Sequence, residues 1–379
     1  MFKKSKKIAL AFSAAGLALA LVTTACGNGG SSGTAPTEPG NTETPPAETI
    51  TLKMANIYPV KHVVHENGYV VMQKLMEEKS NGRIKVEMYP TEQLGSAFDM
   101  VDLIGNKVTD IGTIVPAYWP DKFPVSQVYG LPGIYSDNWV GVQAMWKSLH
   151  EGPIYEELKA AGIVPLMLEA APITEWVTKS KKIEKADDVA GLKIRSTGGI
   201  MDSGLKSAGA VPVQMPLTQL YEGLDRGTLD GATMNFSLAS GFSIQEVAGY
   251  VTHGGGVFPI GLSLAVMSAD TFNSLPEDVQ QIIYEAGKEA TISMVSAFFA
   301  DNDVKMEAFR EAGVEIVEVS PSFVEEMRNK MQPAYDSYVD VLNTRGMDGT
   351  AVLEGIYKDI EYAKGVSDPK VLPDYDIGG

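Results

Sequence analysis

The sequence predicts an α/β fold made of two domains with a cleft between them. Two series of alternating strands and helices follow one another along the chain, and a helix of about 37 residues comes after the second series. The chain has 379 residues, and at roughly 150 residues per domain this length also predicts two domains. Since each series forms a sheet covered by helices, we expect a cleft where the two units meet.

The first 25 residues have the layout of a signal peptide. Four lysines lie within residues 3–7, and fifteen residues without a charge follow from Ile8 to Val22. Fifteen helical residues span only about 22 Å, which is short of the roughly 30 Å hydrocarbon core of a bilayer. A permanent transmembrane anchor is therefore the weaker interpretation.

Cys26 follows directly and is the only cysteine of the chain. The residues before it resemble the bacterial lipobox, in which the cysteine becomes the acylated N-terminus, although Thr23 stands where leucine is commonest. The alternative is ordinary cleavage near Ala25 that leaves a free thiol. Residues 26–49 have almost no large apolar side chain, so we expect a flexible tether. The sequence thus predicts a protein outside the cytoplasm, lipid-anchored to the outer face of the cell membrane or periplasmic.

The first α/β unit begins near Ile50. Alternating apolar residues predict strands at 50–57, 83–89 and 108–115, and helical spacing predicts helices at 62–79 and 96–107. This β-α-β-α-β order favours a parallel sheet. Ligands of such sheets bind at the carboxyl ends of the strands, which here are residues 57–59, 90–94 and 115–119.

The second unit follows a predicted helix at 139–162. We expect strands at 163–168, 174–180, 192–195, 211–215 and 229–234, with helices at 198–209 and 217–226. His253, just before three glycines, is expected to lie in a loop.

A long helix is expected between Pro276 and Gly313, because this stretch holds no proline and only one glycine, Gly287. Such a helix would measure about 55 Å and should cross both domains. We expect the first domain to comprise residues 50–172 and 261–300, and the second to comprise residues 173–260 and 301–379 with the C-terminal helices.

Charge and motifs exclude several classes of function. The chain has 48 acidic against 31 basic residues, a net charge of −17, and no local basic patch, so nucleic-acid binding is not expected. It has no phosphate-binding loop, nucleophile elbow, HExxH helix or paired-cysteine motif. His62 and His65 would need two further ligands to hold a metal, so we expect them to face water or the cleft at a helix start. No cofactor or metal is predicted.

An ordered series of motifs lies between residues 183 and 234. It comprises Gly191–Arg195 (GLKIR), Gly209–Pro216 (GAVPVQMP), Tyr221–Leu224 (YEGL) and Gly227–Gly231 (GTLDG). Pieces at 82–86, 93–95 and 275–279 extend the series over nearly all of residues 50–340. The series resembles the substrate-binding proteins of TRAP transporters, which deliver organic acids to an ion-coupled membrane permease. The resemblance implies a periplasmic-binding-protein-like fold, with two α/β domains and a long helix spanning both.

The resemblance implies that Arg195, at the end of the GLKIR motif, holds the carboxylate of the ligand. A guanidinium can donate two parallel hydrogen bonds to a carboxylate, and this pair is stronger in a closed, dry cleft than in water. From the pattern alone, the alternative is a structural arginine paired with a surface acid.

Two positions depart from the family pattern. Many acid-binding members carry a second arginine where this chain has Glu175, and losing that cation disfavours dicarboxylates and sugar acids. Glu175 either faces the cleft, where it takes a ligand hydroxyl or amine, or lies on the solvent side of its strand. The usual asparagine after the Asp-Gly pair is replaced by Met234, with Asn235 displaced by one. Thr233 replaces the glutamate that a metal-dependent branch of the family uses.

The other candidate ligand contacts are mostly apolar or aromatic and lie near predicted strand ends. They are Tyr58, His62, Tyr118, Trp119, Leu217, Met234, Asn235 and Phe236. Each alone is more typical of the core. Together they favour a monocarboxylate with an apolar or aromatic body.

The sequence therefore predicts a solute receptor that binds an organic monocarboxylate and delivers it to the small and large permease subunits of a TRAP transporter. One alternative is a ligand-binding sensor that signals to a membrane receptor. A secreted enzyme on the same fold is less favoured, because no acid, base and nucleophile constellation is present.

Overall fold

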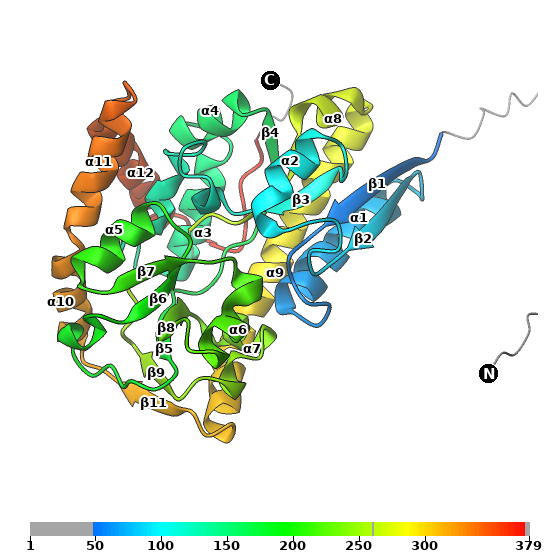
Figure 1. The fold of residues 1–379 in the computed structure, drawn as a ribbon. Coiled ribbons are helices and arrows are strands. Elements are labelled where there is room, and N and C mark those ends of the chain that lie inside the picture. The colour runs from blue at the N-terminus through cyan, green and yellow to red at the C-terminus, as the bar shows by residue number, and fades with distance from the viewer. Residues whose placement is uncertain (1–47, 260, 376–379) are drawn as a thin grey trace, which may run out of the picture. The chain divides into compact units, whose positions relative to one another are not determined.

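The computed structural model describes residues 48–259 and 261–375 (Figure 1). The predicted signal peptide, Cys26 and most of the tether lie outside the described residues. Within the described part of the chain, no helix combines the length and hydropathy needed to cross a membrane.

The first sheet has five strands in the order β2-β1-β3-β10-β4. Their bounds are β1 Ile50–Ala55, β2 Ile84–Tyr89, β3 Ile111–Ile114, β4 Ile163–Leu168 and β10 Leu264–Ser268. The parallel arrangement predicted for the first three strands is confirmed, because β1 pairs in parallel with both β2 and β3. β10 comes from much later in the chain and is antiparallel to both β3 and β4.

The second sheet has six strands in the order β11-β9-β5-β8-β6-β7. Their bounds are β5 Glu175–Thr178, β6 Lys193–Ser196, β7 Val211–Gln214, β8 Gly231–Met234, β9 Tyr250–His253 and β11 Glu315–Glu318. β5 is antiparallel to its two neighbours, whereas β6 is parallel to β7 and β8. The loop expected at His253 was wrong, since this residue ends β9 and pairs with Glu318 of β11.

The helices cover the sheets and form the C-terminal part of the fold. They are α1 Val70–Lys79, α2 Met100–Gly105, α3 Asn138–Ser148, α4 Pro153–Ala160, α5 Ile200–Ser207, α6 Leu220–Asp225, α7 Phe236–Gly241, α8 Ala269–Ser274, α9 Glu277–Glu311, α10 Pro321–Met331, α11 Pro333–Thr344 and α12 Gly349–Lys364. The single helix predicted at 139–162 was wrong. Gly152 takes a left-handed conformation (φ 83°), and Pro153 then starts α4 as its first residue, so two helices form instead.

The chain passes between the two sheets along three connections: β4 to β5, β9 to β10, and the long helix α9. The first two connections are joined by hydrogen bonds. The N–H of Glu169 donates to the carbonyl of Ser263 (2.8 Å), and both the N–H and the hydroxyl of Thr174 donate to the carbonyl of Phe258 (3.2 and 2.8 Å). α9 packs on α1 and β4 beside the first sheet and on α7 and β11 beside the second. The prediction that one long helix spans both units is confirmed. The exact domain boundaries stay a prediction.

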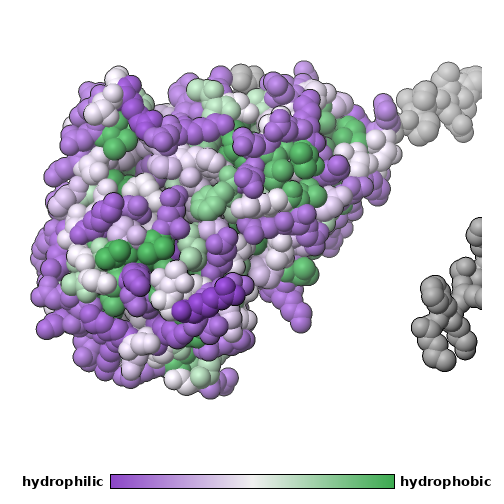
Figure 2. All heavy atoms as spheres, viewed as in Figure 1, coloured by the Kyte–Doolittle hydropathy of each residue, from purple (hydrophilic) through white to green (hydrophobic). Residues whose placement is uncertain are grey.

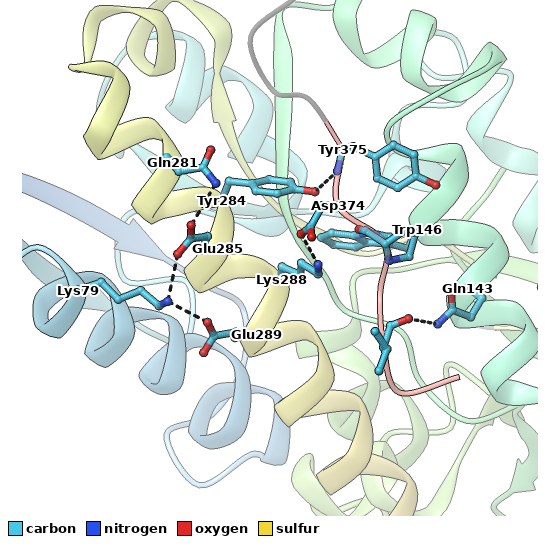
Figure 3. Close-up of polar contacts among 12 residues, drawn as sticks. Lys79, Gln143, Trp146, Gln281, Tyr284, Glu285, Lys288, Glu289, Asp374 and Tyr375 are labelled. Carbon is cyan, nitrogen blue, oxygen red and sulfur yellow. Dashed lines mark hydrogen bonds and ion pairs between the residues drawn. The ribbon is translucent and has the colours of Figure 1, made fainter. Parts of the chain in front are cut away.

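Residues 366–375 form a C-terminal strap that ties α3 to α9 (Figure 3). On the α3 side, Gln143 and Trp146 donate to strap carbonyls (2.8 to 3.1 Å). On the α9 side, Asp374 pairs with Lys288, and the N–H of Tyr375 donates to the Tyr284 hydroxyl (3.0 Å). The long helix is thus held at its first half by the C-terminus.

The visible surface is mostly hydrophilic (Figure 2), in keeping with the excess of acidic residues. Hydrophobic residues reach it in patches near α2 and near β7 and α5, where Val108 and Val211 are 40% and 47% exposed. Most large apolar side chains are instead buried between the sheets and their helices, with Trp146, Trp176, Phe236 and Phe298 at 2% exposure or less.

Candidate functional site

A cavity of about 80 Å³ lies between the two sheets. Its wall is formed by residues that follow β1, β3 and β4 of the first sheet and by residues on or after β6 and β8 of the second. Its apolar side chains include Ile57, Val115, Ile200, Leu217, Met234, Leu238, Phe258 and Phe298. Such a small, mostly apolar cavity with a few polar groups is typical of a site for a small organic ligand.

Arg195 is the cation of this cavity. It lies on β6 and is only 8% exposed. Its Nε–H donates to the carbonyl of Met215 (2.9 Å), and Nη2 donates to the hydroxyl of Tyr118 (3.0 Å). A guanidinium has five N–H donors, and these are the two that bond to described residues. No carboxylate of the described residues lies within ion-pair distance of Arg195, so a buried positive charge borders the cavity without a counter-ion.

Two consecutive glycines lie shortly after Arg195 in the chain. Gly198 and Gly199 follow β6 and both have positive φ (93° and 57°). A Cβ on Gly199 would lie 2.4 Å from Oε1 of Gln127, and one on Gly198 would lie 2.8 Å from Nε2 of Gln214. The positive φ of both residues favours glycine at these positions.

Glu169 is the carboxylate of this cavity and is 2% exposed. It follows β4 and accepts hydrogen bonds from the hydroxyls of Tyr58 (2.7 Å), Ser263 (2.6 Å) and Tyr69. Burial raises the pKa of Glu169, while the hydrogen bonds from Ser263, Tyr69 and Tyr58 act in the opposite direction. The cavity thus has a buried acid attached to the first sheet and a buried cation attached to the second.

Five of the predicted site residues line the cavity: Arg195, Tyr58, Tyr118, Leu217 and Met234. They come from five separate segments of the chain, two after strands of the first sheet and three on or after strands of the second. Tyr118 ends a short 3₁₀ turn, Pro116–Tyr118, that follows β3, and its hydroxyl accepts the hydrogen bond from Arg195.

Three other predicted residues are not among those that line the cavity. Asn235 is fully buried and caps α7, accepting a hydrogen bond from the N–H of Leu238 (2.8 Å). Phe236 packs edge-on against Phe309 of α9 (ring centroids 5.4 Å apart). Trp119 lies beside Phe123, with ring centroids 6.5 Å apart. Their contacts are those of core and capping residues.

Glu175 neither lines the cavity nor faces solvent. Its Oε1 lies 3.1 Å from Nδ1 of His253 across the β5–β9 pair, at the points where two of the connections join the second sheet. Burial raises the pKa of Glu175, and the hydrogen bond with Glu175 raises the pKa of His253. The two side chains therefore form a polar pair that links adjacent strands.

His62, expected to face water or the cleft, is only 1% exposed and is not among the residues that line the cavity. The N–H of Val64 donates to its Nδ1 (3.1 Å), and its ring stacks on Tyr58 with centroids 4.9 Å apart. Burial lowers the pKa of His62 to about 3, so the imidazole is neutral. His65 is also buried, and its Nδ1 lies 3.1 Å from Nδ2 of Asn56.

The described residues hold no group of three or more histidine, cysteine or acidic side chains arranged to bind a metal. Nδ1 of His62 accepts a hydrogen bond from the N–H of Val64, and Nδ1 of His65 lies within hydrogen-bond distance of Asn56. The polar groups that line the cavity include Arg195, Glu169 and the hydroxyls of Tyr58, Tyr118 and Ser263.

Several cavity residues were missed from the sequence. Glu169 had a usable signal, since it directly follows a predicted strand, where α/β sheets bind ligands. The sequence held no comparable signal for three other lining residues, Ser263, Phe258 and Phe298. They come from a connection and from the long helix, and their place at the cavity depends on how distant segments pack.

The family model for bacterial extracellular solute-binding proteins, family 7, matches residues 54–340. The chain belongs to this family. Among its relatives is the uncharacterized protein YiiZ of Salmonella typhimurium, which is 28% identical over 317 residues, covering 82% of this chain and 89% of YiiZ.

Two solved structures are similar to this family member. One is a TRAP solute-binding protein from Rhodoferax ferrireducens in complex with copurified benzoate (TM-score 0.78, 25% identity, 84% of this chain and 100% of that chain covered). Another is a TRAP solute-binding protein from a Sulfitobacter species with bound β-D-galacturonate (TM-score 0.71, 23% identity, 81% and 99% covered). The predicted family and two-domain α/β fold are confirmed.

Proposed function

We propose that this solute-binding protein captures an organic monocarboxylate in the cavity between its two sheets and delivers it to the membrane permease subunits of a TRAP transporter. The observation that carries the proposal is Arg195, a buried cation that has no acidic partner among the described residues and lines a small cavity. A ligand carboxylate would supply the missing counter-charge and use the N–H donors that remain.

The ligand would have an apolar or aromatic body. Leu217, Met234, Phe258 and Phe298 form much of the wall, and Arg195 is the only Lys or Arg among the residues that line the cavity in the described part of the chain. A single cation in the cavity wall matches a ligand that has a single carboxylate. The Rhodoferax relative holds benzoate, which fits this chemistry, whereas the Sulfitobacter relative holds a sugar acid, so the ligand class has to be tested directly.

Thermal unfolding with a ligand panel tests this proposal. We expect benzoate-like and branched-chain monocarboxylates to raise the melting temperature of the purified protein, because a ligand that binds only the folded state stabilises it by mass action. C4-dicarboxylates should give smaller shifts. Stabilisation by dicarboxylates alone would contradict the monocarboxylate proposal, and mass spectrometry of copurified material gives an independent identification.

Cys26 is proposed to carry the lipid anchor. It lies outside the described residues, so the support is the lipobox-like sequence before it and the tether-like composition after it. We expect the wild-type protein to fractionate with membranes and Cys26→Ala to appear in the soluble extracytoplasmic fraction, since an unacylated chain lacks the buried methylene groups that hold it in the bilayer. Equal membrane association of both proteins would contradict this role.

A further inference from the structure

The first-sheet side of the cavity carries a hydrogen-bonded cluster that ligand capture by Arg195 does not use. Tyr58, Glu169 and Ser263 all line the cavity and are linked to one another. Both hydroxyls donate to Oε2 of Glu169, at 2.7 Å from Tyr58 and 2.6 Å from Ser263. Tyr69 donates to Oε1 from behind.

The directions of these hydrogen bonds determine which donors and acceptors the cluster can offer to a ligand. A hydroxyl has one O–H donor and two acceptor lone pairs. Because Tyr58 and Ser263 both direct their proton at Glu169, their oxygens have only lone pairs left for another partner. An ionised carboxylate also only accepts. The cluster therefore offers acceptors and no free donor to a molecule in the cavity.

The two phenols of the cluster stay protonated. Burial raises the pKa of Tyr58 and of Tyr69, and the neighbouring Glu169 raises both further, so the two phenols keep their protons. Burial raises the pKa of Glu169, and the hydrogen bonds from the three hydroxyls oppose that rise.

The two charged side chains of the cavity wall come from different sheets. Arg195 belongs to β6 of the second sheet and Glu169 follows β4 of the first, and the two are not paired with each other. A ligand whose carboxylate binds Arg195 would direct the rest of its body along the apolar wall toward the acceptor cluster.

We propose that Tyr58, Glu169 and Ser263 form a specificity site that favours organic acids carrying an O–H or N–H donor away from the carboxylate and rejects a second ionised carboxylate. This inference rests on the proposed function. A second carboxylate would meet a buried like charge and acceptor oxygens without donors, which leaves it desolvated and unpaired. A hydroxyl or amine would instead complete hydrogen bonds that the cluster leaves open.

Matched aromatic acids test the inference by calorimetric titration of the purified protein. The probes are benzoate, its 3- and 4-hydroxy forms, the fluoro analogues of similar size, and benzene-1,3- and 1,4-dicarboxylate. We expect at least one hydroxybenzoate to bind about ten-fold more tightly than its fluoro analogue, which is the usual worth of one good hydrogen bond. The dicarboxylates should bind more weakly than benzoate.

Variants place this preference on the cluster. Ser263→Ala removes one acceptor and should reduce the hydroxy-to-fluoro affinity ratio several-fold. Glu169→Gln adds N–H donors and should narrow the gap between benzoate and the dicarboxylates. Ser207→Ala is the matched control, because that hydroxyl donates to the carbonyl of Ser203 within α5, away from the cavity.

The outcomes separate the inference from the proposed function. Binding of benzoate through Arg195, with equal affinities for the hydroxy and fluoro analogues, would overturn the specificity site alone. Benzoate binding through Arg195 together with equally tight binding of the dicarboxylates would do the same. If none of these acids binds, or if binding does not depend on Arg195, both the proposed function and this inference fail. Should Glu169→Gln fail to fold, the Ser263→Ala ratio still decides.

Discussion

Arg195→Ala is expected to weaken binding of the ligand's carboxylate by at least about 30-fold. Removing one partner of a buried, hydrogen-bonded charge pair costs about 2–5 kcal/mol, and each 1.4 kcal/mol is a factor of ten in affinity. The loss should be near the upper end of this range because Arg195 is buried and is the one cation of the described cavity wall. Calorimetric titration with the best acid of the panel measures the effect.

Two further variants define the cause. Arg195→Lys keeps the charge but loses the planar fork, so it should bind with an intermediate affinity. Arg226→Ala is the matched control, because Arg226 lies on the surface and pairs with Glu222 of α6. Far-ultraviolet circular dichroism checks that the unliganded fold of Arg195→Ala is intact. An affinity equal to that of the wild type would refute the assigned role of Arg195.

Gly287→Ala is expected to lower the free energy of unfolding by about 1–3 kcal/mol, which is the usual cost of forcing extra atoms into a packed core. A Cβ at Gly287 would lie 2.0 Å from the backbone carbonyl oxygen of Leu166 in β4. One turn later, the hydroxyl of Thr291 accepts a hydrogen bond from the N–H of Leu168 (3.0 Å). Since α9 touches the backbone of the sheet here, the helix itself would have to move.

Gly355→Ala provides the control for this substitution. Gly355 lies within α12 and has no atom within 4 Å of the position a Cβ would take. Alanine there should therefore stabilise the protein by about 0.5–1 kcal/mol through its helix propensity alone. Urea denaturation of the two variants, compared at equal slope, measures both effects. Stabilisation by both substitutions would show that the close approach of α9 to β4 does not constrain the fold.

Much of the fold was predictable because its signals are local. Alternating apolar residues predicted β1 and β2 to within two residues, and a long stretch without proline and with a single glycine predicted α9. The sequence did not reveal that β10 joins the first sheet between β3 and β4, since strand pairing between segments this far apart depends on tertiary packing. The sequence does mark the break between α3 and α4, because Gly152-Pro153 is typical of the end of one helix and the start of the next.

The candidate site divides in the same way. Arg195 was predicted from an ordered motif, and Tyr58 and Tyr118 from strand-end positions; all three line the cavity. Asn235 is also polar and also lies at a strand end, yet its side chain caps α7. Polarity and position alone do not say whether a side chain points toward a ligand or toward its own backbone.

The sequence by itself determined the family, the two-unit α/β order, the long helix and the arginine of the cavity, because motifs and periodicity act over short stretches of chain. Only the tertiary structure decided that Arg195 has no acidic partner among the described residues and that Glu169, with Tyr58 and Ser263, borders the same cavity. The structure also explains why residue 287 is a glycine: the backbone of α9 lies against the backbone of β4 there, with no room for a Cβ. Burial, pairing and proton direction depend on residues more than a hundred positions apart, such as Tyr58 and Glu169, and no local pattern records them.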